Sequence, residues 1–188
     1  RVTFLEGRAG DVLADEAHRA TLDTVSSVFH LAAVVGVLRV VDDPSAMIQT
    51  NVDETAAVYR FAAGRKCPVM LASSSEVYGI CGSAPLGEDD PVTYGPTSVP
   101  RWSYGLTKAL DEHIALDHFA RHMVGGVIVR LFNTIGPGQR GRYGMVAPRF
   151  AQWALKGQPI QVYGDGEQSR TFCDVRDVVG AMIQLMDD

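Results

Sequence analysis

The sequence predicts an α/β fold built on a doubly wound parallel sheet, and three observations support this. Near-continuous apolar runs, such as residues 69–72 and 126–132, are typical of strands that are buried on both faces. Longer segments with helical spacing separate these runs, so that strands and helices alternate along the chain. The chain has 188 residues, of which 46% are apolar, and this is enough for one domain with a single core.

The elements of the first two thirds of the chain are expected in the following order. Strands are expected at residues 2–5, 25–31, 69–72 and 126–132, and helices at 44–64 and about 102–123. The helix at 44–64 has Pro44 near its start and Gly64 at its end, which is the usual asymmetry of helix ends.

Glycine and proline become dense after Asn133, and the pattern changes there. We expect helices at residues 150–156 and 174–186 and a short strand at 161–163. Residues 1–133 are therefore expected to form the core sheet, and residues 134–188 a small substrate-facing region added to it. The chain opens directly in an apolar stretch and stops in a helical one, so we expect truncation at both ends.

The composition argues against several classes of protein. Seventeen basic and 22 acidic residues give a net charge of −5, whereas nucleic-acid binders usually carry a basic surplus. No apolar run reaches the 18 or so residues needed to cross a membrane, and no leader peptide is recognised. The three cysteines are widely spaced and odd in number, which favours reduced thiols in the cytoplasm over a disulfide framework or a metal site.

Tyr104 and Lys108 lie four residues apart and therefore share one face of the predicted helix. A positive charge beside a phenol favours the phenolate and lowers a pKa that is normally about 10. Such a tyrosine can take a proton from a sugar hydroxyl while hydride leaves the same carbon. The alternative is a packed tyrosine next to an unrelated, exposed lysine.

Two strands end in small or polar residues. The strand at 69–72 continues into Ser73-Ser74-Ser75-Glu76, and the strand at 25–31 ends in His30-Leu31-Ala32-Ala33. Ligands of doubly wound sheets bind beyond the carboxyl ends of strands, where these groups are expected. The alternatives are a serine-rich turn and well-packed alanines.

Five motifs in this order resemble one family over essentially the whole chain: HLAA, SSSEVYG, YGLTK, RLFNTIGP and YGDGEQSRTF, which begin at residues 30, 73, 104, 130 and 163. The family is the extended short-chain dehydrogenase/reductases, in the NAD-dependent nucleotide-sugar epimerase/dehydratase branch. The resemblance implies a Rossmann-like NAD-binding core in residues 1–133 and part of a nucleotide-sugar-binding region in 134–188.

The resemblance also implies roles for individual residues. Tyr104 would be the base at the sugar C4 hydroxyl, Lys108 would bind the nicotinamide ribose, and Ser74 would hydrogen-bond the C4 oxygen. Asp11 of the GDV element would meet the adenine. The positions expected to contact NAD are Asp11, Val12, Leu31, Ala32, Ala33, Asn51, Ser73, Tyr104, Lys108 and Leu131. Those expected to contact the substrate are Ser74, Asn133, Val146, Gln161, Tyr163 and Arg170, the last as a bidentate phosphate ligand.

The run Gly136-Pro137-Gly138-Gln139-Arg140-Gly141 spells the dinucleotide fingerprint, but we do not assign it that role. Pro137 lacks the backbone N–H that a pyrophosphate needs, and Gly144 delays the following helix. The family's glycine-rich turn is expected upstream, in a first βαβ unit that this chain lacks.

The sequence supports two interpretations of the reaction that follows C4 oxidation. Family dehydratases carry an aspartate where this chain has Ser75, so dehydration is disfavoured. Glu76 and the Pro100-Arg101-Trp102 run resemble UDP-glucuronate decarboxylases, which makes a decarboxylase the favoured function. A UDP-sugar 4-epimerase is the alternative, with Glu76 then only orienting its loop. A non-catalytic member or binding module is the alternative of another class.

The predicted helix at 102–123 carries two further signals. His113, His118 and His122 have the spacing of a metal clip, but no third ligand type accompanies them and we expect solvent-exposed histidines and no metal. Its apolar stripe is mainly core, and such helices form the dimer contact in the family. We therefore expect a homodimer.

Overall fold

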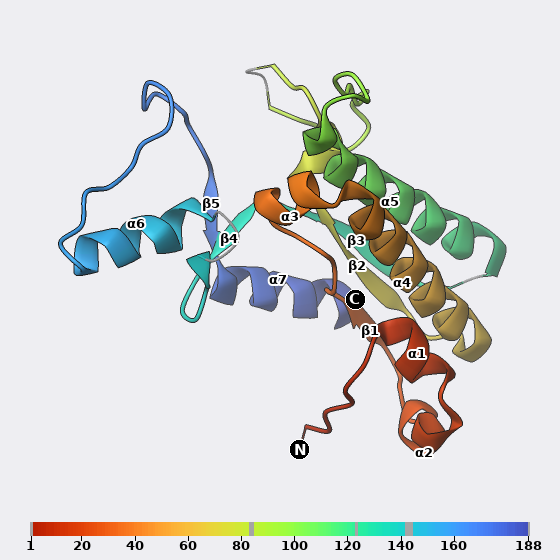
Figure 1. Ribbon diagram of the computed structural model, residues 1–188. Coiled ribbons are helices and arrows are strands. Elements are labelled where there is room, and N and C mark those ends of the chain that lie inside the picture. Colours follow the sequence, from red (N-terminus) through yellow and green to blue (C-terminus); the bar gives the residue numbers. More distant parts are fainter. Residues whose placement is uncertain (1, 83–84, 123, 142–144, 188) are drawn as a thin grey trace.

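The computed structural model describes residues 2–82, 85–122, 124–141 and 145–187 (Figure 1). The elements in chain order are α1 (Ala9–Ala14), η1 (Glu16–His18), α2 (Arg19–Leu22), β1 (Val28–His30), α3 (Val37–Asp42), α4 (Pro44–Arg65), β2 (Val69–Ser74), η2 (Ser75–Tyr78), η3 (Pro100–Trp102), α5 (Ser103–His122), β3 (Gly126–Leu131), β4 (Asn133–Ile135), α6 (Val146–Leu155), β5 (Phe172–Asp174) and α7 (Val175–Asp187).

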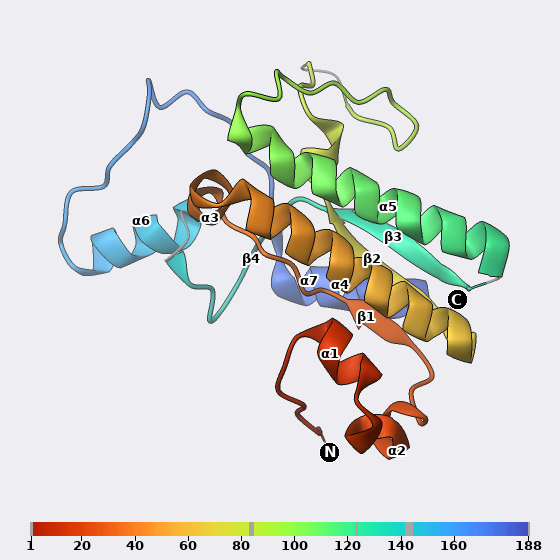
Figure 2. The same cartoon turned by 45° about the vertical axis from the view of Figure 1, so that its right-hand side comes forward.

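The predicted parallel sheet is confirmed. Strands β1, β2 and β3 pair in that order, and both ladders are parallel. Helices α4 and α5 lie side by side over one face of this sheet, and α7 lies on the other (Figures 1 and 2). The register pairs Ser73 with Arg130 and Ser74 with Leu131, so that the carboxyl ends of β2 and β3 finish at the same level.

The core lies between the sheet and the pair of helices α4 and α5. Val69 and Leu71 of β2 are fully buried, as are Tyr59 and Ala62 of α4 and Ala115 of α5. A central parallel strand must be apolar on both faces, which explains the unbroken apolar run in β2.

The bounds of α4 follow from its caps. The Asp43 side chain accepts a hydrogen bond from the backbone N–H of Ala46 (3.0 Å), and Pro44 occupies the first turn. The helix continues past Gly64, because the residue that stops it is Lys66, whose φ of 53° is left-handed. The predicted end at Gly64 was therefore one residue early.

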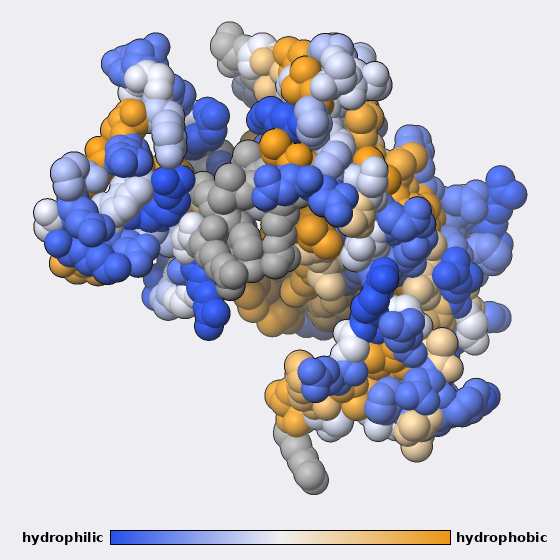
Figure 3. All heavy atoms as spheres, viewed as in Figure 1, coloured by the Kyte–Doolittle hydropathy of each residue, from blue (hydrophilic) through white to orange (hydrophobic). Residues whose placement is uncertain are grey.

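Two predicted strands are wrong. Residues 2–5 pair with no strand, and this apolar segment lies at the surface (Figure 3), with Val2 and Phe4 almost fully exposed. Residues 161–163 are also irregular; the second sheet of this region is instead the parallel pair β4–β5, in which Asn133 faces Phe172. Strands β4 and β5 have three residues each, which is too few to show a periodic pattern in the sequence.

No helix in the described part of the chain has the length and apolar character that a membrane crossing requires.

Candidate active site

A cavity of about 490 Å³ opens at the carboxyl ends of the three strands, within the usual size range of small-molecule sites. It collects many of the residues singled out from the sequence. Those that line it are Leu31, Ala33, Ser73, Ser74, Glu76, Tyr104, Lys108, Leu131, Asn133 and Val146.

Tyr104 enters the cavity from the first turn of α5. Its carbonyl accepts a hydrogen bond from the Thr107 hydroxyl (2.7 Å), which steadies this turn. Gly105 lets the turn approach η2 closely, because a Cβ at this position would lie 2.5 Å from the Glu76 carbonyl oxygen. The close approach sets the phenol beside Ser74, whose hydroxyl hydrogen-bonds it. Gly105 was not singled out from the sequence, and only its place inside the YGLTK motif pointed to it.

The pKa of Tyr104 is raised to about 12, chiefly because burial disfavours the phenolate. Ser74 lowers this pKa by hydrogen bonding, whereas the negative charges of Asp111 and Glu76 raise it. The prediction that Lys108 brings the pKa of Tyr104 below its usual value is therefore wrong for this structure. The physical reason is that burial outweighs the lysine, whose charge is already paired.

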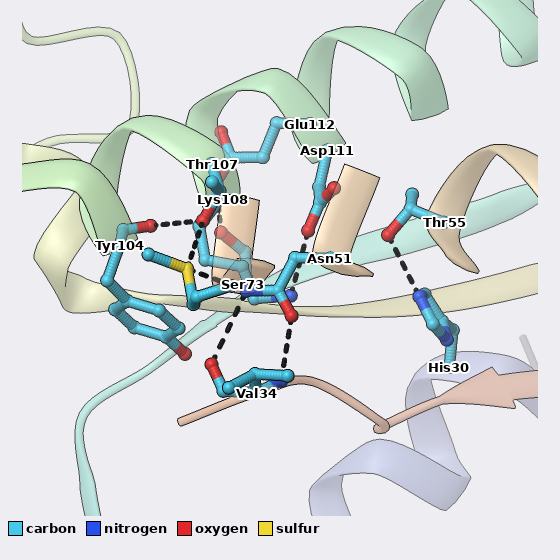
Figure 4. Close-up of polar contacts among 11 residues, drawn as sticks. His30, Val34, Asn51, Thr55, Ser73, Tyr104, Thr107, Lys108, Asp111 and Glu112 are labelled. Atoms are coloured by element: carbon cyan, nitrogen blue, oxygen red, sulfur yellow. Dashed lines mark hydrogen bonds and ion pairs between the residues drawn. The ribbon is translucent and has the colours of Figure 1, made fainter. Parts of the chain in front are cut away.

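The partner of Lys108 is Asp111, one turn further along α5. Lys108 Nζ lies 3.1 Å from Asp111 Oδ2, and the two side chains are 3% and 0% exposed (Figure 4). Burial raises the pKa of Asp111, while Lys108 and the Thr55 hydroxyl of α4 oppose that rise. Thr55 Oγ1 is in turn 2.9 Å from Nε2 of His30, which is buried at the end of β1.

A second buried cluster joins the ends of β2 and β3 to α5. Ser73 donates a hydrogen bond to Glu112, and Arg130 forms a bidentate pair with the same carboxylate, with Nη2 2.8 Å from Oε2. Glu112 thereby raises the pKa of Arg130. Ser73 lines the cavity, but its hydroxyl already donates its hydrogen bond to Glu112.

Glu76 and Arg101 form an ion pair at the cavity wall. Arg101 Nη1 lies 2.9 Å from Glu76 Oε2, and the guanidinium stacks on the Trp102 ring at 5.0 Å. Both side chains are about half exposed, so the pair can open at little cost. Together with Lys108 they are the charged residues that line the cavity within the described ranges. Arg101 was not named as a site residue from the sequence, although the Pro-Arg-Trp run was noticed.

Seven of the predicted site residues do not line the cavity. Asn51 is 2% exposed, and its Oδ1 accepts a hydrogen bond from the Val34 N–H (2.7 Å), so it supports the turn after β1. Arg170 donates to the carbonyl of its neighbour Ser169. The residues outside the cavity wall are Asp11 and Val12 on α1, Ala32, Asn51, and Gln161, Tyr163 and Arg170 in the exposed segment before β5.

The glycine-rich run at 136–141 is explained by packing at its first position. A Cβ on Gly136 would lie 2.3 Å from Val175 Cγ1, so the glycine permits contact with α7.

The described residues contain no group of three or more metal-binding side chains. His113 and His122 are exposed as expected, but His118 is half-buried. It lies against Tyr59 of α4, with the ring centroids 5.4 Å apart. The prediction of an exposed histidine is therefore wrong at this position, because α4 covers that side of α5.

Residues 3–188 match the model of the NAD-dependent epimerase/dehydratase family. A UDP-N-acetyl-alpha-D-glucosaminuronate decarboxylase of Bacillus cytotoxicus is 44% identical over 162 residues, which are 86% of this chain and 50% of that protein. UDP-glucuronic acid decarboxylase 3 of Arabidopsis thaliana is 31% identical over 180 residues, 94% of this chain and 52% of that protein. The chain spans about half the length of these curated relatives.

Solved structures give the same fold. The UDP-N-acetylglucosamine 4-epimerase from Methanobrevibacter ruminantium M1, in complex with UDP-N-acetylmuramic acid, superposes with a TM-score of 0.83 at 30% identity, over 95% of this chain and 56% of that one. The UDP-glucuronic acid 4-epimerase from Bacillus cereus, in complex with UDP-glucuronic acid and NAD, gives 0.79 at 28% identity, over 95% and 54%.

Proposed function

The chain belongs to the NAD-dependent epimerase/dehydratase family, and from this we propose that the protein oxidises C4 of a UDP-linked uronic acid transiently and removes its carboxyl group. The observation that carries the proposal is the cavity that brings Ser74, Tyr104 and Lys108 together with the Glu76–Arg101 pair. Similarity to two decarboxylases of UDP-uronates supports the substrate class.

The residues of the cavity fit NAD. Leu31, Ala33 and Val35 present small or apolar side chains after β1, where a flat ring can approach the backbone. Lys108 and Tyr104 line the same cavity and carry groups that can bind ribose hydroxyls. Bound NAD would supply an acceptor for hydride from C4 and return that hydride at the end of the reaction.

Tyr104 is the base in this proposal. Its phenolate removes the proton of the C4 hydroxyl while the C4–H electron pair leaves as hydride. Ser74 donates a hydrogen bond that stabilises negative charge on the phenol and can pass to the sugar oxygen. Burial holds the pKa of Tyr104 at about 12, so loss of the phenol proton needs assistance, which in this proposal comes from the Ser74 hydrogen bond and from the positive charge of Lys108 in the same cavity.

Oxidised C4 turns a uronic acid into a β-keto acid, which loses carbon dioxide readily. The C5–C6 bond breaks, its electron pair moves toward the C4 oxygen, and C5 then takes a proton. Arg101 supports this choice of substrate, because it is the arginine that lines the cavity in the described part of the chain and can meet a sugar carboxylate. Glu76 would then lose its partner and lie free beside the reacting sugar.

A UDP-sugar 4-epimerase is the second candidate. It is favoured by the structural similarity to two 4-epimerases, one of which was solved with UDP-glucuronic acid and NAD. In that case the keto sugar turns over before hydride returns to its other face, and the carboxyl group stays in place.

The proposal is tested by incubating the full-length protein with NAD and UDP-glucuronate or UDP-N-acetylglucosaminuronate and identifying the product by NMR. A UDP-pentose or its 2-acetamido analogue is expected. A C4 epimer would replace the proposal by the second candidate, and no turnover of either compound would favour a non-catalytic role. Tyr94→Phe serves as a control, because its hydroxyl bonds only the Val77 carbonyl (2.8 Å).

We propose in addition that the protein is a cytoplasmic homodimer. Support for the dimer comes from the exposed leucines of α5, which are Leu106, Leu110 and Leu116. Support for a reducing compartment comes from the three free cysteines. Sedimentation of the full-length protein, with an aspartate at Leu110 as the matched variant, tests the dimer.

A further inference from the structure

The ammonium group of Lys108 contacts the first member of a buried chain of polar side chains. Asp111 meets it at 3.1 Å, the Thr55 hydroxyl stabilises the charged form of Asp111, and His30 bonds Thr55 at 2.9 Å (Figure 4). The chain runs from α5 through α4 to the end of β1, and each member is less than 5% exposed.

A buried ion pair of this kind is costly, because two charges lose their water and recover only part of that energy from each other. Asp111 Oδ1 even lacks a hydrogen-bond partner among the described residues. An apolar pair would fill the same space between α4 and α5 at lower cost. The Lys108–Asp111 pair is buried at this cost, and its lysine lines the same cavity as Tyr104, which points to a role of the pair in how Lys108 acts.

We propose that Asp111 is a positioning residue: supported by Thr55 and His30, it fixes the Lys108 ammonium group in the wall of the cavity that Tyr104 also lines and, through its negative charge, limits how strongly Lys108 promotes loss of the phenol proton. This inference rests on the proposed role of Tyr104 as the base. Asp111 itself does not line the cavity, so it acts through Lys108.

The surrounding charges allow the sign of the effect to be stated. The groups facing Asp111 are Lys108 and Glu112 on α5, Thr55 and Tyr59 on α4 and, beyond Thr55, His30 on β1. Those facing Tyr104 are Ser74 at the end of β2, Glu76 on η2, and Lys108 and Asp111 on α5. Because the Asp111 charge raises the pKa of Tyr104, its removal lets the Tyr104 phenol lose its proton at lower pH.

The main test is Asp111→Asn in the full-length protein, which keeps the size of the side chain and a hydrogen-bond acceptor. Tyr104 and Asp111 are seven residues apart on one helix, about 10 Å along its axis, so the acidic limb of the kcat/KM profile should move down by on the order of one pH unit. Thr55→Val should move it in the same direction by less. A purely structural role would lower activity without moving the profile.

A second readout needs neither substrate nor cofactor. The lysines of this chain are Lys66, Lys108 and Lys156, of which only Lys108 is buried. Reductive methylation followed by peptide mass spectrometry should leave Lys108 protected in the parent protein and label it several-fold faster in Asp111→Asn. Lys66 and Lys156 are the internal standards.

Glu112→Gln is the matched control, since it removes a buried carboxylate from the next position and leaves Asp111 intact. It should be less stable, with Lys108 still protected and the pH profile of the parent. A parental pH profile in Asp111→Asn, or a Lys108 that stays protected there, would overturn the inference. If the parent protein turned over no UDP-sugar, the proposed function would fail, and the labelling would still decide the role of Asp111.

Discussion

The Tyr104 side of the cavity and the segment before β5 are built differently. Ser73 of β2 bonds Glu112 of α5, and Ser74 of β2 bonds Tyr104. Lys108 pairs with Asp111, which Thr55 of α4 supports, and both Lys108 and Ser73 are almost fully buried. Gln161, Tyr163 and Arg170 lie in an exposed segment, where Tyr163 is 68% exposed and meets Arg149 at 3.3 Å. The Tyr104 side, which is the rigid half of the proposed site, is therefore fixed by packing within the chain, whereas the segment before β5, its proposed substrate half, is shaped by few contacts.

This contrast shows which contacts pre-organise the chemistry. Groups that must meet the reacting carbon within a fraction of an ångström need rigid support. Groups that bind a diphosphate can be ordered by the ligand, because charge-assisted hydrogen bonds form over a wider range of starting positions.

The largest effect is expected from removing the phenol hydroxyl on the rigid side. Tyr104→Phe should lower kcat by roughly 10²–10⁴-fold, the usual contribution of general acid–base catalysis, with the fold intact. Tyr163→Phe, on the exposed side, should change KM more than kcat. Steady-state kinetics of the two variants decide the point, and near-parental turnover by Tyr104→Phe would contradict the assignment of the base.

Two glycine substitutions compare the rigidity of the halves directly. Gly126 starts β3 with φ 148°, and a Cβ there would lie 2.0 Å from the Val69 carbonyl oxygen, whereas Gly157 has φ 62° and open space around it. Gly126→Ala should therefore cost roughly 3 kcal/mol or more, and Gly157→Ala only the local strain of about 1 kcal/mol. Denaturant unfolding measures both, and equal losses would remove the distinction.

His30 makes the stability of the rigid half depend on pH. Burial lowers the pKa of His30 to about 4, while the unfolded chain takes up a proton near pH 6.5. Below pH 6.5 the unfolded state binds more protons, so stability falls as the pH drops from 6.5 to about 4, by about 3 kcal/mol in all.

The measurement is unfolding free energy against pH, with His30→Gln compared with the exposed His113→Gln. His30→Gln should flatten the curve between pH 6.5 and 4, and His113→Gln should leave it unchanged. A curve equally steep in His30→Gln would show that another group causes the acid sensitivity.

The smallest effect on stability is expected at the boundary between the halves. Arg101→Met opens the half-exposed pair with Glu76 and should change the unfolding free energy by less than about 1 kcal/mol. It should nevertheless raise the Kd of a UDP-uronate on the order of 10-fold, while the Kd of UDP-glucose stays the same. Isothermal titration with both ligands measures the two Kd values, and equal losses would remove Arg101 from carboxylate recognition.

The sequence predicted the rigid half well, because the sequence patterns that mark its strands and helices are local. Apolar runs marked β2 and β3, a proline marked the start of α4, and four-residue spacing placed Tyr104 and Lys108 on one face. The spacing of Lys108 and Asp111 was equally visible, but the contacts of Asp111 with Thr55, and of Thr55 with His30, join three elements and depend on the fold. The same holds for the pKa of Tyr104, which burial determines.

The substrate half was predicted less well for the opposite reason. Strands of three residues, such as β4 and β5, carry no period, and a partner strand 39 positions away decides whether they form. The run Gln161-Val162-Tyr163 has the composition of a strand but pairs with no other strand in the described residues. Tertiary contacts override propensity in such short segments.

Solvent isotope incorporation tests most directly the proposal that this cavity removes a carboxyl group after oxidation at C4. The full-length protein is incubated with NAD and UDP-glucuronate in deuterium oxide, and the product is analysed by mass spectrometry and NMR. We expect a UDP-pentose that has lost carbon dioxide and carries one deuterium at C5. A UDP-hexuronate of unchanged mass with C4 inverted would contradict it.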